Sequence, residues 1–597
     1  MKKYLFAVLR LYLAFLLVFV LQKLFFWALN ASYAGGITFV DVLQVLWHGL
    51  RLDAVATSYL MAVPLLVMAV AVHAKRARLR NWLTWWFVPA SVLVALAFLA
   101  DAVLYNFWGA KLDAADFIYA QNPKDLFASL PWWAALLALA AWALLALGQV
   151  LLLRWAVPKA MPRLRHKWLG TVVAVLLLGV DFLGMRGGVQ ESTANPSYAY
   201  FSQNQFLNHA ALNPAFNILH SMSKSEDLAR EFAFYPSEEL ERLTAGVYDS
   251  YPDIADTLLA TQRPNIVLLI WEGGGNLVTA NDTIAPYFNR LKGEGVYFSH
   301  CYANNFRTDR GLVSLLDGWP GLPTTSVMKM SGRCRNLPSI AKHLGAEGYH
   351  SAFYYGGDID FTNMRGYLFE TGYEQVTGGE NYAWAPNQGK WGADDEYLLT
   401  LAPNELPPSP FFATYLTLSS HEPWEVPYHR LAEGKANSFA YTDSCIYAFV
   451  QQLKQSGVWD SLLMIVVPDH GVDYGGQHTY SVAASRIPVL WLGGAVKSAK
   501  VVDKMMNQSD LATTLMAQLG IEASDFVFSR NVLSARYRPT LMMHAYKNGL
   551  NLIDTTGSTR FDLVNGQVLP AEPLHRPDAT EMAKALLQLV YCRTAQL

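Results

Sequence analysis

Five apolar runs in the first third of the chain limit its folding more than any other feature. They cover residues 4–29, 54–72, 82–107, 132–157 and 168–185. A helix needs about 20 apolar residues to cross the hydrocarbon core of a bilayer, and each run approaches or exceeds that length. The first run is too long for a signal-peptide core and lacks a clear cleavage site after it, so we interpret it as a retained span. The sequence therefore predicts a transmembrane domain of five helices over residues 1–187.

Basic residues between the runs predict how this domain is oriented. The second and fourth loops are rich in Lys and Arg: Lys75, Arg76, Arg78, Arg80, Lys159, Arg163, Arg165 and Lys167. The first and third loops hold mainly Arg51, Lys111 and Lys124. By the positive-inside rule, the N-terminus lies in the cytoplasm and the chain after Met185 lies outside. The net charge of −2 gives no overall field that favours nucleic acid.

The chain after the last run changes pattern twice. Residues 188–262 contain apolar residues at helical spacing and read as a helical connector along the membrane. Over residues 263–536, strand and helix patterns alternate, which predicts a mostly parallel sheet covered on both faces. Residues 537–597 read as short antiparallel strands and a helix that complete this domain. Strands are expected at residues 265–271, 297–302, 350–355, 411–418, 462–467 and 489–492.

The stretch PNIVLLIWEGGGN, residues 264–276, places an acid at the end of a strand. Ile266 to Trp271 form an unbroken apolar run, which suits a strand buried on both faces of a parallel sheet. Glu272 and three glycines follow. Open α/β sheets bind ligands at the carboxyl ends of their strands, so Glu272 is a candidate ligand. The alternative is a flexible turn in which Glu272 is merely solvated.

A second stretch, SLLMIVVPDHG at residues 461–471, is again an apolar strand and ends in Asp469 and His470. Adjacent carboxylate and imidazole groups are a pair of metal ligands. Two such strand ends in one domain can converge on a single divalent cation. The sequence therefore predicts a metal site that lacks only an oxygen nucleophile.

Thr308 is the candidate nucleophile, because it precedes Gly311 and a helical apolar pattern. A hydroxyl at a helix N-terminus can meet both a metal and the helix dipole. Metal coordination lowers the pKa of a hydroxyl and so supplies the activation that a free threonine lacks. The alternative is that Thr308 is a helix N-cap, a common position for threonine.

The order of these features along the chain resembles the lipoteichoic acid synthase-like branch of the alkaline phosphatase/sulfatase superfamily. Members of this branch have five N-terminal spans and an exported phosphotransferase domain, so the resemblance covers essentially the whole chain. It implies an α-helical transmembrane domain followed by an α/β sulfatase-like domain. The metal ligands that it implies are Glu272, Thr308, Asp469 and His470, with Thr308 as the catalytic nucleophile.

The resemblance also implies three substrate-binding positions. His421 in TLSSHEPWEVP matches a histidine that touches the transferred phosphoryl group, and we assign it a catalytic role as well. Arg365 in FTNMRGYLFETGYE matches an arginine after the family's substrate-binding strand. His478 in YGGQHTY faces either the metal and leaving group or the solvent. Asp394 and Asp395 orient substrate or, as we favour, cap the following helix.

The implied activity is transfer of a phosphorylated lipid head group, with phosphoglycerol from phosphatidylglycerol as our first choice. The acceptor is a glycan, a glycolipid or a growing polymer. The cofactor is one divalent ion, Mn²⁺ by preference and Mg²⁺ or Zn²⁺ as alternatives. The implied location is the bacterial cytoplasmic membrane, in contact with its lipids, with the catalytic domain on the extracytoplasmic side.

Departures from the family pattern keep other functions open. Many relatives carry Ser after the metal-binding Glu, where this chain has Gly273 to Gly275. Sulfatases need a modified Cys or Ser in a C-x-P-x-R context, and FRTDRG offers none. Phosphoethanolamine transferases usually have many disulfide cysteines, whereas this chain has four: Cys301, Cys334, Cys445 and Cys592. A phosphoethanolamine transferase, an ester hydrolase and an inactive membrane sensor remain the alternatives.

A disulfide is permitted in the exported part, and Cys301 and Cys334 flank the expected site, so they are the favoured pair. Four free, buried thiols are the alternative.

The predicted orientation can be tested by labelling. A cysteine placed in the 240s should react with a membrane-impermeant thiol reagent in intact cells, because the basic loops should stay inside. Labelling that appears only after lysis would overturn the orientation.

Overall fold

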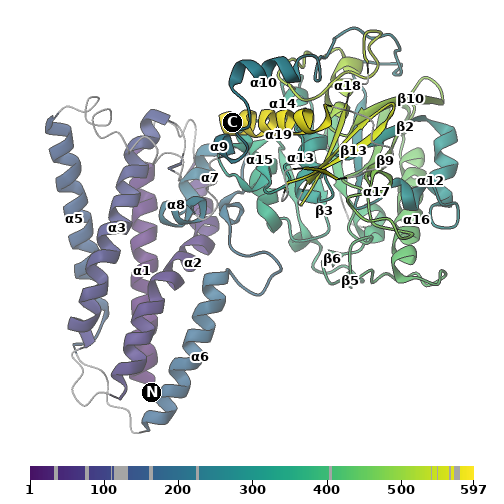
Figure 1. The fold of residues 1–597 in the computed structure, drawn as a ribbon. Helices are drawn as coiled ribbons and strands as arrows, with labels where there is room; N and C mark the ends of the chain where they lie inside the picture. Colours follow the sequence, from purple (N-terminus) through teal and green to yellow (C-terminus); the bar gives the residue numbers. More distant parts are fainter. Residues whose placement is uncertain are drawn as a thin grey trace. The chain divides into compact units, whose positions relative to one another are not determined.

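The computed structural model describes residues 1–31, 38–73, 79–108, 111–112, 132–159, 166–222, 228–401, 406–538, 541–547, 549–563, 567–569 and 578–597. Figure 1 shows two compact units, residues 1–225 and 226–597. The predicted connector, residues 188–262, falls on both sides of this boundary. The two units are described separately below.

Five long apolar helices form most of the first unit. They are α1 (Lys2–Leu29), α2 (Phe39–Ala71), α3 (Leu79–Trp108), α5 (Trp132–Ala156) and α6 (Lys167–Arg186). Among the described residues, these five are long and apolar enough to cross a membrane. The five predicted spans are therefore confirmed as helices. The basic residues Lys75, Arg76, Arg78, Lys124, Arg163 and Arg165, used to predict orientation, lie outside the described residues.

The second span begins earlier than the apolar pattern indicates. A capping box between Thr38 and Asp41 starts α2 at Phe39, rather than at residue 54. The extra helical turns, residues 39–53, contain polar residues and were therefore not counted in the apolar run. One of them, Asp53, is buried and pairs with Lys23 of α1, whose Nζ lies 2.6 Å from Asp53 Oδ1. Burial of a charge requires such a partner, so the ion pair explains why a carboxylate is tolerated here.

Short helices of the expected connector belong to both units. The 3₁₀ helix η3 (Pro196–Ala199), α7 (Gln205–Ala211) and α8 (Pro214–Met222) lie in the first unit. Asn213, just before α8, donates a hydrogen bond of 2.9 Å to Asp53. Helices α9 (Leu228–Glu231) and α10 (Ser237–Thr244) lie in the second unit. The described residues of this region thus include several short helices, and the connector's course along the membrane stays a prediction.

An eight-stranded sheet organises the second unit, in the order β10-β2-β9-β8-β1-β7-β3-β4. Only β9 runs antiparallel to its neighbours, so the predicted mostly parallel sheet is confirmed. The strands are β1 (Asn265–Trp271), β2 (Val296–Tyr302), β3 (His350–Tyr355), β4 (Gln375–Thr377), β7 (Phe411–Leu416), β8 (Leu462–Pro468), β9 (Arg486–Leu492) and β10 (Lys500–Asn507).

Both faces of this sheet are buried. Along β1, Ile266, Leu268 and Ile270 pack into one apolar core, and Val267, Leu269 and Trp271 pack into another. Successive side chains of a strand point to opposite faces, so the continuous apolar run predicted this arrangement. The first core includes α13 (Thr308–Asp317), α14 (Ile340–Ala346) and α18 (Asp510–Leu519); the second includes α12 (Pro286–Leu291) and α16 (Gly434–Gln455).

Two strands of the eight-stranded sheet were missed by the sequence analysis. Strand β10 is an edge strand with exposed and charged positions, KVVDKMMN, so it lacks the apolar run of the inner strands. Strand β4 has three residues and pairs with β3 at the other edge. The predicted C-terminal antiparallel part is confirmed as β11 (Met542–Tyr546), β12 (Gly549–Asp554), β13 (Gly557–Asp562) and β14 (Gln567–Leu569), with α19 (Ala579–Gln596) following.

The favoured disulfide is wrong, because all four cysteines are free thiols. Cys301 is buried on β2, whereas the Cys334 thiol donates to the carbonyl oxygen of Val327, 3.2 Å away. Burial raises the pKa of both thiols well above the usual value. Cys301 and Cys334 therefore pack as small apolar side chains. The alternative of four free, buried thiols holds for three of them, because Cys592 is only partly buried.

A buried ion pair in the second unit gives a stability prediction. Arg530 and Asp510 are each at most 1 % exposed, and Arg530 Nη2 lies 2.7 Å from Asp510 Oδ2. The Arg530→Met variant should lose about 3–5 kcal/mol of unfolding free energy, because it leaves the Asp510 carboxylate buried without a cation. Unfolding of the full chain in detergent, followed by tryptophan fluorescence, measures the loss.

The matched control is Arg536→Met. Arg536 pairs with Asp253 at the surface, where the two side chains are 59 % and 38 % exposed. Such a pair contributes about 0–1 kcal/mol. Equal losses in the two variants would contradict the assignment of Arg530 as a buried structural cation.

Candidate metal centre and active site

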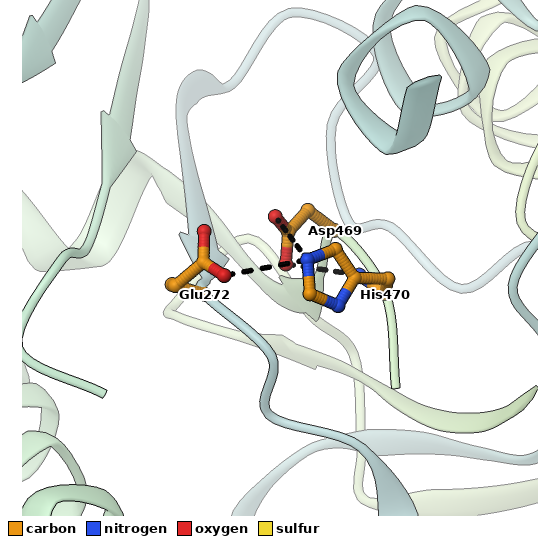
Figure 2. A group of neighbouring side chains, drawn as sticks. All are labelled: Glu272, Asp469 and His470. Atoms are coloured by element: carbon orange, nitrogen blue, oxygen red, sulfur yellow. Dashed lines mark hydrogen bonds and ion pairs between the residues drawn. The ribbon is translucent and has the colours of Figure 1, made fainter. Parts of the chain in front are cut away.

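Three predicted metal ligands meet at the carboxyl ends of two neighbouring strands. Glu272 follows β1, and Asp469 and His470 follow β8. One ligand atom from each of them lies within 4.8 Å of the other two. His470 Nε2 is 3.3 Å from Glu272 Oε1 and 3.4 Å from Asp469 Oδ2. Figure 2 shows the three side chains turned toward one another. The structure thus brings together side chains about 200 residues apart in sequence.

Strand register explains why these side chains converge. Strand β1 pairs in parallel with β8, with Trp271 opposite Pro468, so the next residue of each strand emerges beside the other. Strand β1 also pairs with β7, and the Glu272 amide donates to Thr417 Oγ1 over 2.9 Å. The backbone amide of Gly273 donates to Asp469 Oδ1 at 2.9 Å. Gly273 has a φ of 63°, a conformation that glycine adopts without strain.

A backbone contact fixes the imidazole of His470. Its Nδ1 lies 2.8 Å from the carbonyl oxygen of Gly471. A carbonyl oxygen only accepts, so Nδ1 carries the proton and donates. Nε2 therefore faces the two carboxylates as the nitrogen that can bind a metal. Such a contact to the second ring nitrogen is the usual way in which a ligating histidine is oriented.

Thr308 completes the cluster from the first position of α13. Its hydroxyl donates to Glu272 Oε2 over 3.0 Å and lies 3.4 Å from His470 Nε2. Arg307 occupies the N-cap position, with no side-chain capping bond. The alternative of Thr308 as an N-cap is therefore wrong.

Gly311 allows α13 to approach the site closely. A Cβ atom at Gly311 would lie 2.1 Å from the carbonyl oxygen of Asp469, far inside van der Waals contact. The absence of a side chain lets the first turn of the helix pack directly on the end of β8. This contact places the Thr308 hydroxyl beside His470.

The electrostatics of the cluster favour a cation at its centre. Burial raises the pKa of Asp469 to about 7, and the charge of Glu272 adds to this. Burial opposes ionisation of Glu272 too, but His470 outweighs it and lowers the pKa of Glu272 to about 2. The carboxylates likewise outweigh burial at His470 and raise its pKa to about 10. A divalent cation therefore binds in competition with the proton on His470.

One oxygen atom of the cluster lacks a hydrogen bond, which also suits a bound metal ion. Asp469 Oδ2 is buried and accepts no hydrogen bond from the described residues. Its contact with His470 Nε2, 3.4 Å long, pairs charges but is not a hydrogen bond, and a metal ion would satisfy this oxygen. Two carboxylates, a hydroxyl and an imidazole form a mixed oxygen and nitrogen donor set, which Mn²⁺, Mg²⁺ and Zn²⁺ all accept.

His421 lies on the loop after β7, next to this cluster. Its Nδ1 lies 2.9 Å from the carbonyl oxygen of Glu422 and donates to it, which leaves Nε2 for a substrate. The Ser420 hydroxyl, one residue earlier, donates to the carbonyl oxygen of Glu272 over 2.6 Å. Asp395 accepts hydrogen bonds from the amides of Leu418 and Ser419 and so holds the same loop.

The other two predicted substrate residues are placed differently. Arg365 forms ion pairs with Asp360, 2.8 Å from its Nε, and with Glu380. A guanidinium has five N–H donors, so these pairs leave donors for a phosphoryl oxygen. His478 is exposed, and its ring stacks on Tyr480 with centroids 5.1 Å apart. The roles of both residues stay predictions.

Some supporting residues were missed or misread. Thr417 and Ser420 belong to a run of hydroxyl residues, TLSSH, directly after a buried strand, and that position was the available signal. Asp394 caps the following helical segment as expected, because its Oδ1 accepts from the Tyr397 amide at 2.9 Å. Asp395 instead accepts hydrogen bonds from the loop after β7. Gln508 Nε2 donates to the carbonyl oxygen of Asp469, a tertiary contact without a sequence signal.

Part of the chain is similar in sequence to known proteins. Residues 264–521 match the Sulfatase family model. The lipoteichoic acid synthase-like protein YvgJ of Bacillus subtilis is 22 % identical over 398 residues, which cover 59 % of this chain and 63 % of YvgJ. Lipoteichoic acid synthase 2 of B. subtilis is 21 % identical over 350 residues, 51 % of each chain. The match thus spans less than two thirds of these relatives.

A solved structure has the same fold over part of this chain. A protein of the alkaline phosphatase superfamily from Vibrio parahaemolyticus aligns with a TM-score of 0.52 at 23 % identity. The alignment covers 62 % of this chain and 98 % of that protein.

Metal binding can be tested at the two residues after β8. The Asp469→Asn and His470→Ala variants should lose the bound ion, from about one per chain to near zero, because each removes a ligand. The second unit should stay folded, since it has large apolar cores of its own. Elemental analysis of the purified full chain, with circular dichroism for folding, measures both outcomes.

His300→Ala is the matched control, because His300 pairs with Asp503 on the surface. It should retain the parental metal content. Parental metal content in Asp469→Asn or His470→Ala would place the metal elsewhere.

Proposed function

We propose that this chain is a membrane-anchored phosphotransferase. Its residues 264–521 match the Sulfatase family model and follow five apolar helices in the sequence. The observation that carries the proposal is the position of the Thr308 hydroxyl, 3.0 Å from Glu272 and 3.4 Å from His470. A hydroxyl within reach of a metal-ligand cluster is a nucleophile prepared for phosphoryl chemistry.

The proposed donor is a phospholipid, with phosphatidylglycerol as the first choice. Two considerations support this choice: the apolar helices keep the domain close to lipid, and its relatives are named lipoteichoic acid synthases. The acceptor is a glycan, a glycolipid or a polymer. The protein lies in the bacterial cytoplasmic membrane with its catalytic domain outside, as the basic loops predict.

In the first step, Thr308 Oγ1 attacks the phosphorus of the lipid. The bond from Thr308 to phosphorus forms, and the bond from phosphorus to the diacylglycerol oxygen breaks. The Thr308 proton moves toward Glu272, to which the hydroxyl already donates. His421 protonates the departing diacylglycerol oxygen, and Arg365 neutralises charge on the phosphoryl oxygens. The product is phosphoglyceryl-Thr308 and free diacylglycerol.

In the second step, an acceptor hydroxyl attacks the same phosphorus. His421 takes its proton, the new phosphodiester bond forms and the bond from phosphorus to Thr308 breaks. The departing Thr308 oxygen takes back the proton that Glu272 received in the first step. Because His421 gives a proton in one step and takes one in the other, the enzyme returns to its starting state.

A divalent ion held by Glu272, Thr308, Asp469 and His470, with Mn²⁺ preferred, would lower the pKa of the hydroxyl and neutralise phosphoryl charge. The ligands orient the threonine oxygen, because Glu272 and His470 contact it from two sides.

Replacement of Thr308 tests the proposal. Thr308→Ala should lower transfer by about a thousandfold or more, because it removes the nucleophile. The fold should be unchanged, since Thr308 makes no capping bond. Activity with a fluorescent phosphatidylglycerol in vesicles measures the loss. Intact-mass analysis of the parent should show a phosphoglycerol adduct, and peptide mass analysis should locate it on the peptide that contains Thr308.

Thr308→Ser is the matched control, because it retains a hydroxyl and should keep the adduct. A phosphoethanolamine adduct, seen when phosphatidylethanolamine is offered instead, would identify a phosphoethanolamine transferase. Release of free head group without an acceptor would identify a hydrolase. Near-parental activity in Thr308→Ala would refute the mechanism.

A further inference from the structure

The loop that follows His470 carries His478 at the start of a tight turn. The amide of Ser481 donates to the carbonyl oxygen of His478 over 2.8 Å. Thr479 and Tyr480 are the central residues of this turn, so contacts that hold them also fix His478. The ring of His478 stacks on that of Tyr480, and within the described part of the chain its nitrogens make no hydrogen bond.

Two glycines before His478 do not fix its position. Gly475 and Gly476 are exposed and have φ values of 58° and 82°. A Cβ atom added at either glycine would find open space, with no described atom within 4 Å. Glycine has the widest choice of backbone conformations, so the support for His478 comes from the residues that follow it.

A row of side chains on the C-terminal sheet holds this turn. His544 on β11 lies opposite Asn551 on β12, and Asn551 lies opposite Arg560 on β13, so the three share one face. The Asn551 side-chain amide donates to the carbonyl oxygen of Tyr480 over 2.6 Å. The guanidinium carbon of Arg560 lies 4.5 Å from the centre of the Tyr480 ring. A cation over the face of a tyrosine ring is attracted to it, so both the backbone and the ring of Tyr480 are held.

His544 joins the turn to the segment that leads to Thr308. Its ring lies between two carbonyl oxygens, with Nδ1 2.8 Å from that of Ala303 and Nε2 3.1 Å from that of Thr479. Burial lowers the pKa of His544, so the ring is neutral at neutral pH and donates through one nitrogen only. One contact is therefore a hydrogen bond and the other is close packing. Together they set the distance between the two segments.

The opposite face of the C-terminal sheet belongs to the apolar core. Its buried side chains there include Met543, Leu550, Leu552 and Phe561. His544 and Asn551 are themselves each 1 % exposed. A loop held by a rigid scaffold is the usual setting for a binding or catalytic side chain. The row thus gives the turn of His478 a firm support.

We propose that His544, Asn551 and Arg560 are positioning residues, which hold the turn of His478 so that its imidazole contacts the phosphoryl group of the donor. The proposal rests on the proposed transferase function. The loop starts directly after His470, so only a short length of chain separates the His478 imidazole from the metal-ligand cluster. An imidazole N–H without a partner among the described residues is available to donate to a phosphoryl oxygen.

The rate of adduct formation on Thr308 tests the proposal, with the full chain in phosphatidylglycerol vesicles. His478→Ala, Asn551→Ala and Arg560→Met should each slow this step about tenfold or more, because a displaced contact to the reacting group is costly. Arg560→Lys should stay within about threefold of the parent, since it keeps a cation over the Tyr480 ring. A parental rate in His478→Ala or Arg560→Met would overturn the proposal.

A double-variant cycle separates positioning from a general structural role. If the row acts through His478, adding Asn551→Ala to His478→Ala should slow adduct formation by less than about twofold further. Losses that multiply would overturn the proposal, because the row would then act on the fold as a whole.

Thr556→Ala is the matched control in the same sheet. Thr556 lies in the exposed turn between β12 and β13, where its hydroxyl donates to Asp554 over 2.6 Å. It makes a side-chain hydrogen bond as Asn551 does, but not to the loop of His478. This variant should form the adduct at the parental rate.

Hydrogen exchange separates this proposal from the transferase function. The amides of residues 474–481 should exchange about tenfold faster in Asn551→Ala than in the parent, because the turn loses its support. This holds whether or not phosphatidylglycerol is a donor, and unchanged exchange would overturn the proposal. If the parent forms no adduct on Thr308 but exchange rises in the variant, the transferase function and the phosphoryl contact fail, whereas the hold of the row on the turn stands.

Discussion

The parallel register between β1 and β8 is the constraint on which the site depends. Trp271 lies opposite Pro468, so Glu272 and Asp469 leave the sheet at the same level. A slip of one residue would turn every side chain of a strand to the opposite face. The apolar residues that fill both cores prevent this slip, because each would lose its packing. Burial of ordinary Val, Leu and Ile side chains thus fixes the distance between two ionised groups far apart in the sequence.

The same edge of the sheet brings several polar groups close together. Glu272 and Asp469 are 6 % and 0 % exposed, which costs free energy unless opposite charge is near. The amides of Gly273 and His470 offset part of this cost by donating to Asp469 Oδ1. The remaining negative charge is what attracts a cation and, through it, a phosphate. The proposed chemistry thus depends on carboxylate charge that neighbouring amides and His470 neutralise only in part.

Sequence reasoning predicted the parts of this structure that depend on local pattern. Apolar runs marked β1 and β8, and the residues that follow them marked the cluster of Glu272, Asp469 and His470. Thr308 was singled out because a hydroxyl precedes a helical pattern, and the structure places its hydroxyl 3.0 Å from Glu272. Its role as nucleophile stays a proposal. Tertiary contacts could not be predicted: Gln508 on Asp469, Asp395 on the β7 loop, and Asp53 on Lys23. The Cys301–Cys334 pairing failed because proximity in sequence to the site does not set the direction of a side chain.

The strand order has a consequence for how the catalytic domain is made. Strand β1 is synthesised early, yet both of its neighbours, β7 and β8, come much later in the chain. Pairing over such sequence separations gives a high contact order, which slows folding because long loops must close first. Until β8 has emerged, β1 exposes an apolar edge that invites aggregation. The nascent chain therefore passes through a long interval in which the apolar strand β1 has no partner, and aggregation competes with folding during that interval.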